Sequence, residues 1–147
     1  MQTIHNEIGI GAPAPIVWEI VSDLEGWARW NPFMQARGKL AGGEKLLVIM
    51  AAPGGKKVSI EPRVVMVDDG REFRWKGRTF GGLFRAEHGF RVTAEDVGRC
   101  RFEQFEMFSG LLAGAILSRQ GKAIETGFQA MNRMLKREAE KRARERA

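Results

Sequence analysis

The segment HGFRVTAEDVGRCRFEQFE, residues 88–106, indicates the fold more clearly than any other part of the chain. Apolar and polar residues alternate on both sides of a central Asp-Val-Gly turn, which is typical of a β-hairpin. If the hairpin is symmetric about Val97, each residue pairs with the one equally distant on the other side. The pairs that this register places on one inward face, which Phe84 and Ala86 extend, are Val92 with Phe102, Phe90 with Gln104, and His88 with Glu106.

A histidine opposite a glutamate on an apolar face indicates either chemistry or structural support. Burial drives both groups toward their neutral forms, whereas their mutual attraction favours the charged forms. His88 and Glu106 can act as acid and base in the enolisation or dehydration of a carbonyl compound. We favour the alternative, a structural hydrogen bond that also reaches Gln104 or Asn6, because no third polar residue is placed as an oxyanion stabiliser. Under either interpretation we predict that His88 and Glu106 are in contact.

The residues before residue 33 change from a strand pattern to a helical one. Residues 3–12 alternate with the period of a half-buried strand. Residues 13–24, PAPIVWEIVSDL, have helical apolar spacing, and their prolines lie where a helix can begin. Residues 25–32, EGWARWNP, end at Asn-Pro and indicate a short helical turn followed by a break. We therefore predict one strand followed by two short helices.

Residues 33–108 consist of strand patterns separated by glycine-containing turns. The six expected strands are FMQARGK (33–39), KLLVIM (45–50), KVSIEPRVVMV (57–67), EFRWKG (72–77), LFRAEHGFRV (83–92) and RCRFEQFEMF (99–108). Because the turns between them are short, neighbouring strands are expected to be antiparallel. With the N-terminal strand, the prediction is a seven-stranded antiparallel sheet.

A long helix is expected from about residue 110 to beyond residue 135. Its apolar stripe consists of Leu117, Ile124, Phe128, Met131 and Leu135. Three glycines, at positions 114, 121 and 127, interrupt this helix, although each costs about 1 kcal/mol relative to alanine. Either a sheet or a ligand approaches the helix backbone there, or the first half is frayed or kinked. The fold class is therefore α+β, with a curled sheet around one helix and a cavity between them.

Composition and charge exclude several classes of protein. The 147 residues, 44% hydrophobic and 29% charged, fit a single domain spanning 1–147 with no membrane span, no secretory signal and a cytoplasmic location. Half of the net charge of +6 lies in residues 136–147, where acids and bases alternate as on a solvated helix end, so we expect no nucleic-acid partner. One cysteine, Cys100, and two histidines give little support to a metal site, and we expect no cofactor.

The segment WARWNPFM, residues 27–34, concentrates aromatic area next to the Asn-Pro turn. Base stacking usually needs aromatic residues interleaved with basic ones, and only Arg29 intervenes here. We interpret the segment as a core plug that doubles as the wall of a cavity. Trp30 and Phe33 are expected to face inward, and Trp27 to lie at the lip.

Four segments together resemble a known superfamily: APAPIVWEIVSDLEGWARWNPF, FRWKGRTFGGLFRAEHGFRV, GRCRFEQFEMFSGLLAGAI and GFQAMNRMLK. Their order and spacing are similar to those of the START-like, polyketide cyclase and lipid transport superfamily, in a stand-alone bacterial branch, over residues 3–140. The resemblance implies a helix-grip fold, in which the sheet wraps around the C-terminal helix. It also implies that the protein binds a small hydrophobic ligand.

The expected ligand pocket lies between the sheet and the long helix. The residues expected to line it are Trp30, Phe33, Trp75, Phe84, His88, Phe90, Gln104, Glu106 and Phe128. Residues 77–84, GRTFGGLF, are either a flexible apolar gate of this pocket or a plain hairpin.

Three functions fit this sequence, and we favour the first of them. The protein carries or senses a small hydrophobic ligand, which needs only a pocket with a few polar groups. Alternatively it is a cyclase or dehydratase with His88 and Glu106 as acid and base. The third possibility is a modulator of a partner protein that uses residues 136–147. The sequence leaves the ligand open, and equally the choice between monomer and homodimer.

Overall fold

The computed structural model describes residues 2–51 and 56–147. Its elements in chain order are β1 (Gln2–Ile10), α1 (Ala14–Ser22), η1 (Leu24–Arg29), β2 (Met34–Arg37), β3 (Leu47–Ala51), β4 (Lys57–Ile60), β5 (Arg63–Asp68), β6 (Glu72–Thr79), η3 (Phe80–Gly82), β7 (Phe84–Asp96), β8 (Arg99–Ser109) and α2 (Ala113–Arg146). The predicted α+β class, with one strand, two short helices, more strands and a long C-terminal helix, is confirmed. None of the helices within these ranges is long and apolar enough to cross a membrane.

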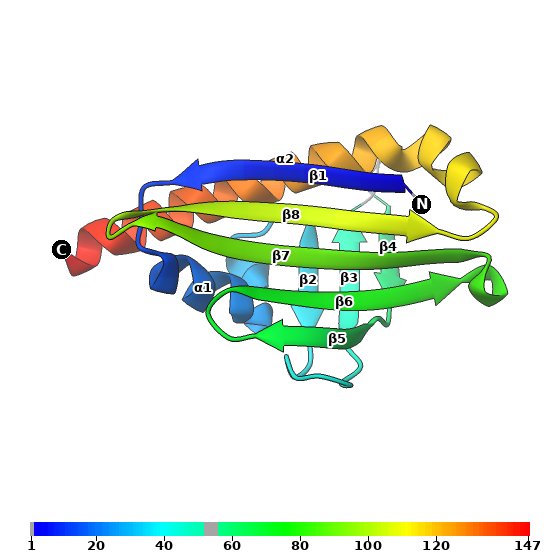
Figure 1. Ribbon diagram of the computed structural model, residues 1–147, viewed down its shortest axis with the longest axis horizontal. Coiled ribbons are helices and arrows are strands. Elements are labelled where there is room, and N and C mark those ends of the chain that lie inside the picture. The colour runs from blue at the N-terminus through cyan, green and yellow to red at the C-terminus, as the bar shows by residue number, and fades with distance from the viewer. Residues whose placement is uncertain (1, 52–55) are drawn as a thin grey trace.

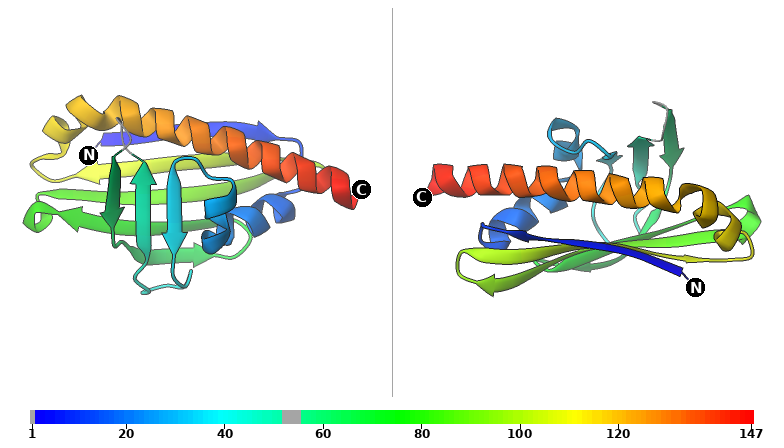
Figure 2. Two further views of the ribbon diagram at one scale, coloured as in Figure 1. Left: turned by 180° about the vertical axis from the view of Figure 1, so that it is seen from behind. Right: turned by 90° about the horizontal axis from the view of Figure 1, so that it is seen from above.

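The strands form two antiparallel sheets. The larger sheet has five strands in the order β1-β8-β7-β6-β5, and the smaller has three in the order β2-β3-β4. Figures 1 and 2 show that α2, α1, η1 and the small sheet all lie on one side of the five-stranded sheet, whose other side is open. This is the helix-grip arrangement that the resemblance implied.

The strand count differs from the prediction at one place. Residues 57–67 were expected to form a single strand, but the chain leaves the small sheet at Ile60 and enters the large one at Arg63. Between these strands the Pro62 carbonyl accepts a hydrogen bond from the Leu46 amide at 2.8 Å. Proline has no amide hydrogen to donate within a sheet, and it therefore marks the change of sheet. The described residues thus contain eight strands in two sheets rather than seven in one.

The buried residues of α2 lie mainly in its second half. Phe128, Met131, Leu135 and Ala139 are fully buried there. Leu117 and Ile124, which continue the predicted apolar stripe, are only half-buried, and no residue between Gly114 and Gly127 is buried. The first half of the helix is therefore covered much less completely than the second.

The helix glycines do not break α2, which is continuous from Ala113 to Arg146. A Cβ atom at Gly127 would lie 2.4 Å from the Phe33 ring, so this glycine admits an aromatic ring against the helix backbone. At Gly121 a Cβ would meet only Leu117 and Ile4, at 3.9 and 4.0 Å, which are ordinary contacts. The prediction of close approach is thus correct at Gly127. The helix is not frayed, although its first turns bend away from the axis of the remainder (Figure 2).

The aromatic segment next to Asn31 lies in the core. Trp30 and Phe33 are each 8% exposed, as expected for inward-facing residues. Trp27 is fully buried, and its indole nitrogen donates a hydrogen bond to the Val21 carbonyl at 2.9 Å. Its expected position at the lip of a cavity was therefore wrong, because the indole packs between α1 and the large sheet. The Asn31 side chain accepts hydrogen bonds from the amides of Phe33 and Met34 and so fixes the turn into β2.

The C-terminal end of α2 has the i,i+4 ion pairs that its charge pattern predicted, Lys136 with Glu140 and Arg142 with Glu138. It also contacts the rest of the chain. Arg146 donates two hydrogen bonds to Glu19 on α1, at 3.1 and 3.0 Å. This helix end is consequently exposed but held against α1.

On the open face of the large sheet, Phe105 on β8 lies across Gly89 on β7. A Cβ atom at Gly89 would lie 2.2 Å from the Phe105 ring. The guanidinium groups of Arg74 and Arg91 lie 5.1 and 4.9 Å from the centre of this ring.

We expect Gly89→Ala to lower the free energy of unfolding by about 1–3 kcal/mol, because the Phe105 ring must leave its place between the two arginines. Urea denaturation measures the change. Gly98→Ala, at a glycine with nothing within 4 Å of an added Cβ, is the control.

Candidate functional site

The predicted register of the β7–β8 hairpin is confirmed, and it brings His88 opposite Glu106. The pairing is symmetric as far as Ala94 with Cys100, after which an irregularity next to the turn shifts it by one residue. His88 Nδ1 lies 3.9 Å from Glu106 Oε1. This distance is a contact but is too long for a hydrogen bond.

The hydrogen bond of His88 goes instead to Gln104. Nε2 of His88 lies 2.8 Å from Gln104 Oε1, the Gln104 amide donates to Asn132 Oδ1 at 3.0 Å, and the Asn132 amide donates to Asn6 Oδ1 at 2.9 Å. Because the Gln104 oxygen can only accept, Nε2 of His88 carries the hydrogen. Nδ1 is therefore left as a free acceptor that faces Glu106.

Sequence reasoning missed Asn132, which joins β8 to β1 through this chain of hydrogen bonds. The residue is 1% exposed and lies on the buried side of α2. A signal was present in the sequence, since Asn132 stands four residues after Phe128 and three before Leu135, on the apolar stripe itself. A polar residue at such a position needs a buried hydrogen-bond partner.

Aromatic rings surround the His88 imidazole. It stacks on Phe90 at a centroid distance of 4.3 Å and lies 4.9 Å from Phe128 and 5.4 Å from Trp75. Burial among these rings lowers the pKa of His88 to about 3, although the hydrogen bond to Gln104 acts in the opposite direction. His88 is therefore neutral at physiological pH and a weak base.

On one side Glu106 adjoins the aromatic residues around His88, and on the other it adjoins a region whose side chains are only half-buried. Its side chain is 17% exposed, and burial raises its pKa to about 8. It is thus mainly a neutral carboxylic acid at neutral pH. Within the described residues the Glu106 carboxyl has no hydrogen-bond partner, and His88 is the one basic side chain with a nitrogen within 4.0 Å of it.

The region next to Glu106 is apolar and lies under the first half of α2. Ile4 on β1 pairs with Glu106 across the sheet, and its side chain faces Gly121 of α2. The helix residues of this region, Leu117 and Ile124, are only half-buried. An unpaired carboxyl therefore adjoins apolar surface that the protein itself covers only in part.

Seven of the nine residues predicted to line a ligand pocket are buried in the core, with exposed fractions of 8% or less; they are Trp30, Phe33, Trp75, His88, Phe90, Gln104 and Phe128. Of the other two, Glu106 is described above, and Phe84 stacks on Phe108 at 5.7 Å. Many of the seven contact each other, as core residues do. Two hollows, of about 420 and about 250 Å³, are lined by other residues. Ligand binding by the nine residues stays a prediction.

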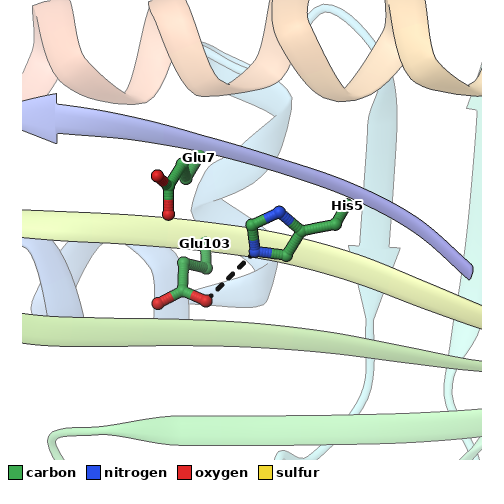
Figure 3. A group of neighbouring side chains, drawn as sticks. All are labelled: His5, Glu7 and Glu103. Carbon is green, nitrogen blue, oxygen red and sulfur yellow. Dashed lines mark hydrogen bonds and ion pairs between the residues drawn. The ribbon is translucent and has the colours of Figure 1, made fainter.

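A second cluster of titratable groups, His5, Glu7 and Glu103, lies on the open face of the large sheet (Figure 3). Their ligand-type atoms lie within 4.8 Å of one another, and His5 Nε2 is 3.1 Å from Glu103 Oε2. Arginine side chains already neutralise the two carboxylates: Arg91 lies 3.2 Å from Glu103, and Arg101 lies 3.5 Å from Glu103 and 3.6 Å from Glu7. The cluster is thus part of a surface ion-pair network.

Cys100 on β8 is fully buried. Burial raises the pKa of its thiol to about 11, so that it is not a thiolate nucleophile at neutral pH.

Comparison with known proteins agrees with this geometry. The sequence matches the family model described as polyketide cyclase / dehydrase and lipid transport over residues 1–140. No curated protein matches the chain.

Among solved structures, the Zhui aromatase/cyclase from Streptomyces sp. R1128 is similar with a TM-score of 0.79 and 17% identity, over 96% of this chain and 94% of that one. Protein Ms6760 from Mycobacterium smegmatis has a TM-score of 0.72 and 17% identity, over 91% and 88% of the two chains. The di-domain ARO/CYC BexL from the BE-7585A biosynthetic pathway has a TM-score of 0.72 and 13% identity over 92% of this chain. The match spans 46% of that protein, about half its length. At these identities the likeness shows the fold alone.

Proposed function

We propose that the chain, which belongs to the polyketide cyclase / dehydrase and lipid transport family, binds a small hydrophobic ligand between the first half of α2 and the large sheet. The ligand carries a carbonyl or hydroxyl group that hydrogen-bonds to Glu106. The core residues His88, Phe90 and Phe128 form the closed end of this site.

The observation that carries the proposal is the unpaired Glu106 carboxyl on the inward face of the sheet. With its side chain 17% exposed, the Glu106 carboxyl can still be reached by water in the free protein. A ligand carbonyl that accepts a hydrogen bond from the protonated carboxyl replaces such a water. The half-buried apolar side chains of Leu117 and Ile124 supply the hydrophobic contact that such a ligand needs.

The pKa values of His88 and Glu106 narrow the acid–base alternative to one residue. A catalytic base works best when its pKa lies near the working pH, and the pKa of His88 is about 3. Glu106, with a pKa of about 8, is better matched to proton transfer at neutral pH. The enzyme alternative therefore depends on Glu106 alone, and it requires a substrate whose turnover is abolished by Glu106→Gln while binding is retained.

We expect Gly121→Phe to abolish binding of Prodan, a neutral naphthalene ketone, as followed by its fluorescence. A Cβ at position 121 has room, and the ring of the new side chain occupies the space beside Ile4 that the ligand needs. Glu106→Leu removes the hydrogen-bond donor and should weaken binding by about tenfold.

The matched control is Gln120→Phe, which adds the same ring one position earlier on the exposed side of the helix and should bind Prodan as the wild type does. Circular dichroism checks that each variant keeps its helix. Wild-type affinity in Gly121→Phe would show that the ligand does not lie under the first half of α2, and the proposal would then be wrong.

A further inference from the structure

Two apolar connections lie side by side at one end of the molecule. The first is η3 with Leu83, between β6 and β7, and the second is the link from β8 to α2 (Figures 1 and 2). They are joined by a hydrogen bond from the Leu112 amide to the Leu83 carbonyl at 3.0 Å. Three large apolar side chains are exposed on this end: Phe80 at 64%, Leu83 at 43% and Leu111 at 88%.

Phe80 has a backbone φ of +54°, and it is the one non-glycine residue with positive φ among those described. This conformation is unfavourable for a bulky residue and is ordinarily occupied by glycine. An exposed phenylalanine at such a position therefore contributes nothing to the fold that a glycine would not. Its exposure instead provides a projecting apolar ring.

Basic residues outnumber acidic ones at this end of the molecule. Residues 76–85 and 107–122 contain five basic residues and neither aspartate nor glutamate. The five are Lys76, Arg78, Arg85, Arg119 and Lys122, all exposed. Lys76 lies directly opposite Glu87 in the sheet and Lys122 stands three residues before Glu125, so the arginines among the five are the cations that matter most here.

Arg78 and Arg85 show this most clearly, because they pair directly across β6 and β7. Like charges opposite each other in a sheet are destabilising. Within the described residues neither arginine lies in an ion pair with a carboxylate, and Arg85 has only a long hydrogen bond to Ser109, at 3.4 Å. An external anion would relieve this repulsion.

We propose that this end of the molecule docks on the surface of a lipid bilayer that contains anionic phospholipids. Projecting apolar side chains that enter the headgroup region, surrounded by arginine and lysine at the level of the phosphates, are the chemistry of interfacial membrane binding. A soluble polyanion would use the cations but not Phe80, Leu83 and Leu111. This inference rests on the surface alone and is independent of the ligand site.

Sedimentation with vesicles tests the proposal. We expect the wild-type protein to bind vesicles of mixed phosphatidylcholine and phosphatidylserine, and to bind pure phosphatidylcholine vesicles much more weakly. Phe80→Gly, which suits the positive φ, should weaken binding by about fivefold or more. Arg78→Glu, which creates an ion pair with Arg85, should weaken it by about 30-fold.

Val97→Ser and Arg137→Glu are the matched controls. Val97 is 94% exposed on the β7–β8 turn at the opposite end, and Arg137 is an exposed cation on α2. Both variants should bind vesicles as the wild type does. If the control variants lost as much vesicle binding as the test variants, net charge alone would explain the binding, and the proposal would be wrong. It would also be overturned if wild-type protein failed to bind the anionic vesicles, or if it bound DNA with the same dependence on Arg78 but bound no vesicles.

Discussion

The free energy of unfolding is expected to be nearly constant between pH 4.5 and pH 6.5, as far as His88 and Glu106 determine it, and to fall on both sides. Burial raises the pKa of Glu106 from 4.5 to about 8. As the pH rises, the unfolded chain therefore loses this proton at a lower pH than the folded protein does. The contribution of Glu106 to the free energy of unfolding is therefore fully present below pH 4.5, and it is lost as the pH rises toward 8.

His88 acts with the opposite sign. Burial lowers its pKa from 6.5 to about 3, so the unfolded chain takes up this proton first as the pH falls. The contribution of His88 to the free energy of unfolding is fully present above pH 6.5, and it is lost as the pH falls toward 3. Each group changes the free energy of unfolding by up to about 1.4 kcal/mol per pH unit, and the two slopes cancel where they overlap.

Glu106→Gln separates the two contributions in urea titrations followed by tryptophan fluorescence. Without Glu106, the fall in stability above pH 6.5 should disappear, and stability should rise with pH between 4.5 and 6.5 because His88 alone remains. Glu95→Gln, on the exposed end of β7, is the control and should keep the shape of the wild-type profile. An unchanged alkaline slope in Glu106→Gln would mean that the Glu106 carboxyl is not desolvated in the folded protein.

The parts of the fold that sequence could predict are those fixed by local period. Alternation with period two gave the register of the β7–β8 hairpin, and with it the meeting of His88 and Glu106. A continuous stripe of period 3.6 gave the long helix. The family resemblance is confirmed because the chain matches the family model, and it added the way in which the sheet grips the helix.

The parts that sequence could not predict depend on partners far away in the chain. Trp27 is buried because Trp75 and Phe90 meet its indole at 5.9 and 5.5 Å, and no local pattern contains these contacts. The greater burial of the second half of α2 likewise depends on residues that are distant in the chain. An apolar stripe shows which side of the helix faces the sheet, but not how closely each turn approaches it.

Replacing Gln104 by leucine should lower the free energy of unfolding by about 2–6 kcal/mol, although the two side chains have similar volumes. Gln104 is fully buried and joins His88 to Asn132. Its loss leaves the His88 Nε2 hydrogen and the Asn132 oxygen without partners, and each unsatisfied buried group costs about 1–3 kcal/mol.

A second substitution tests whether the chain of hydrogen bonds is the cause. Gln104→Leu combined with Asn132→Leu removes the unpaired Asn132 oxygen as well, and its outer partner Asn6 is only half-buried and can be hydrated. The double variant should therefore cost less than the two single changes added together. Asn6→Ala should cost less than Gln104→Leu, because only the Asn132 amide loses a partner, and water can reach the half-buried position 6.

Coupling between positions 104 and 132 also bears on function, because this chain of hydrogen bonds fixes the hydrogen of His88 on Nε2. If the chain is broken, the imidazole is free to carry its hydrogen on Nδ1 instead, which then meets Glu106 as a donor rather than an acceptor. Nitrogen NMR of the imidazole reports this tautomer. Additive energies together with an unchanged tautomer would show that Gln104 fills space and positions nothing.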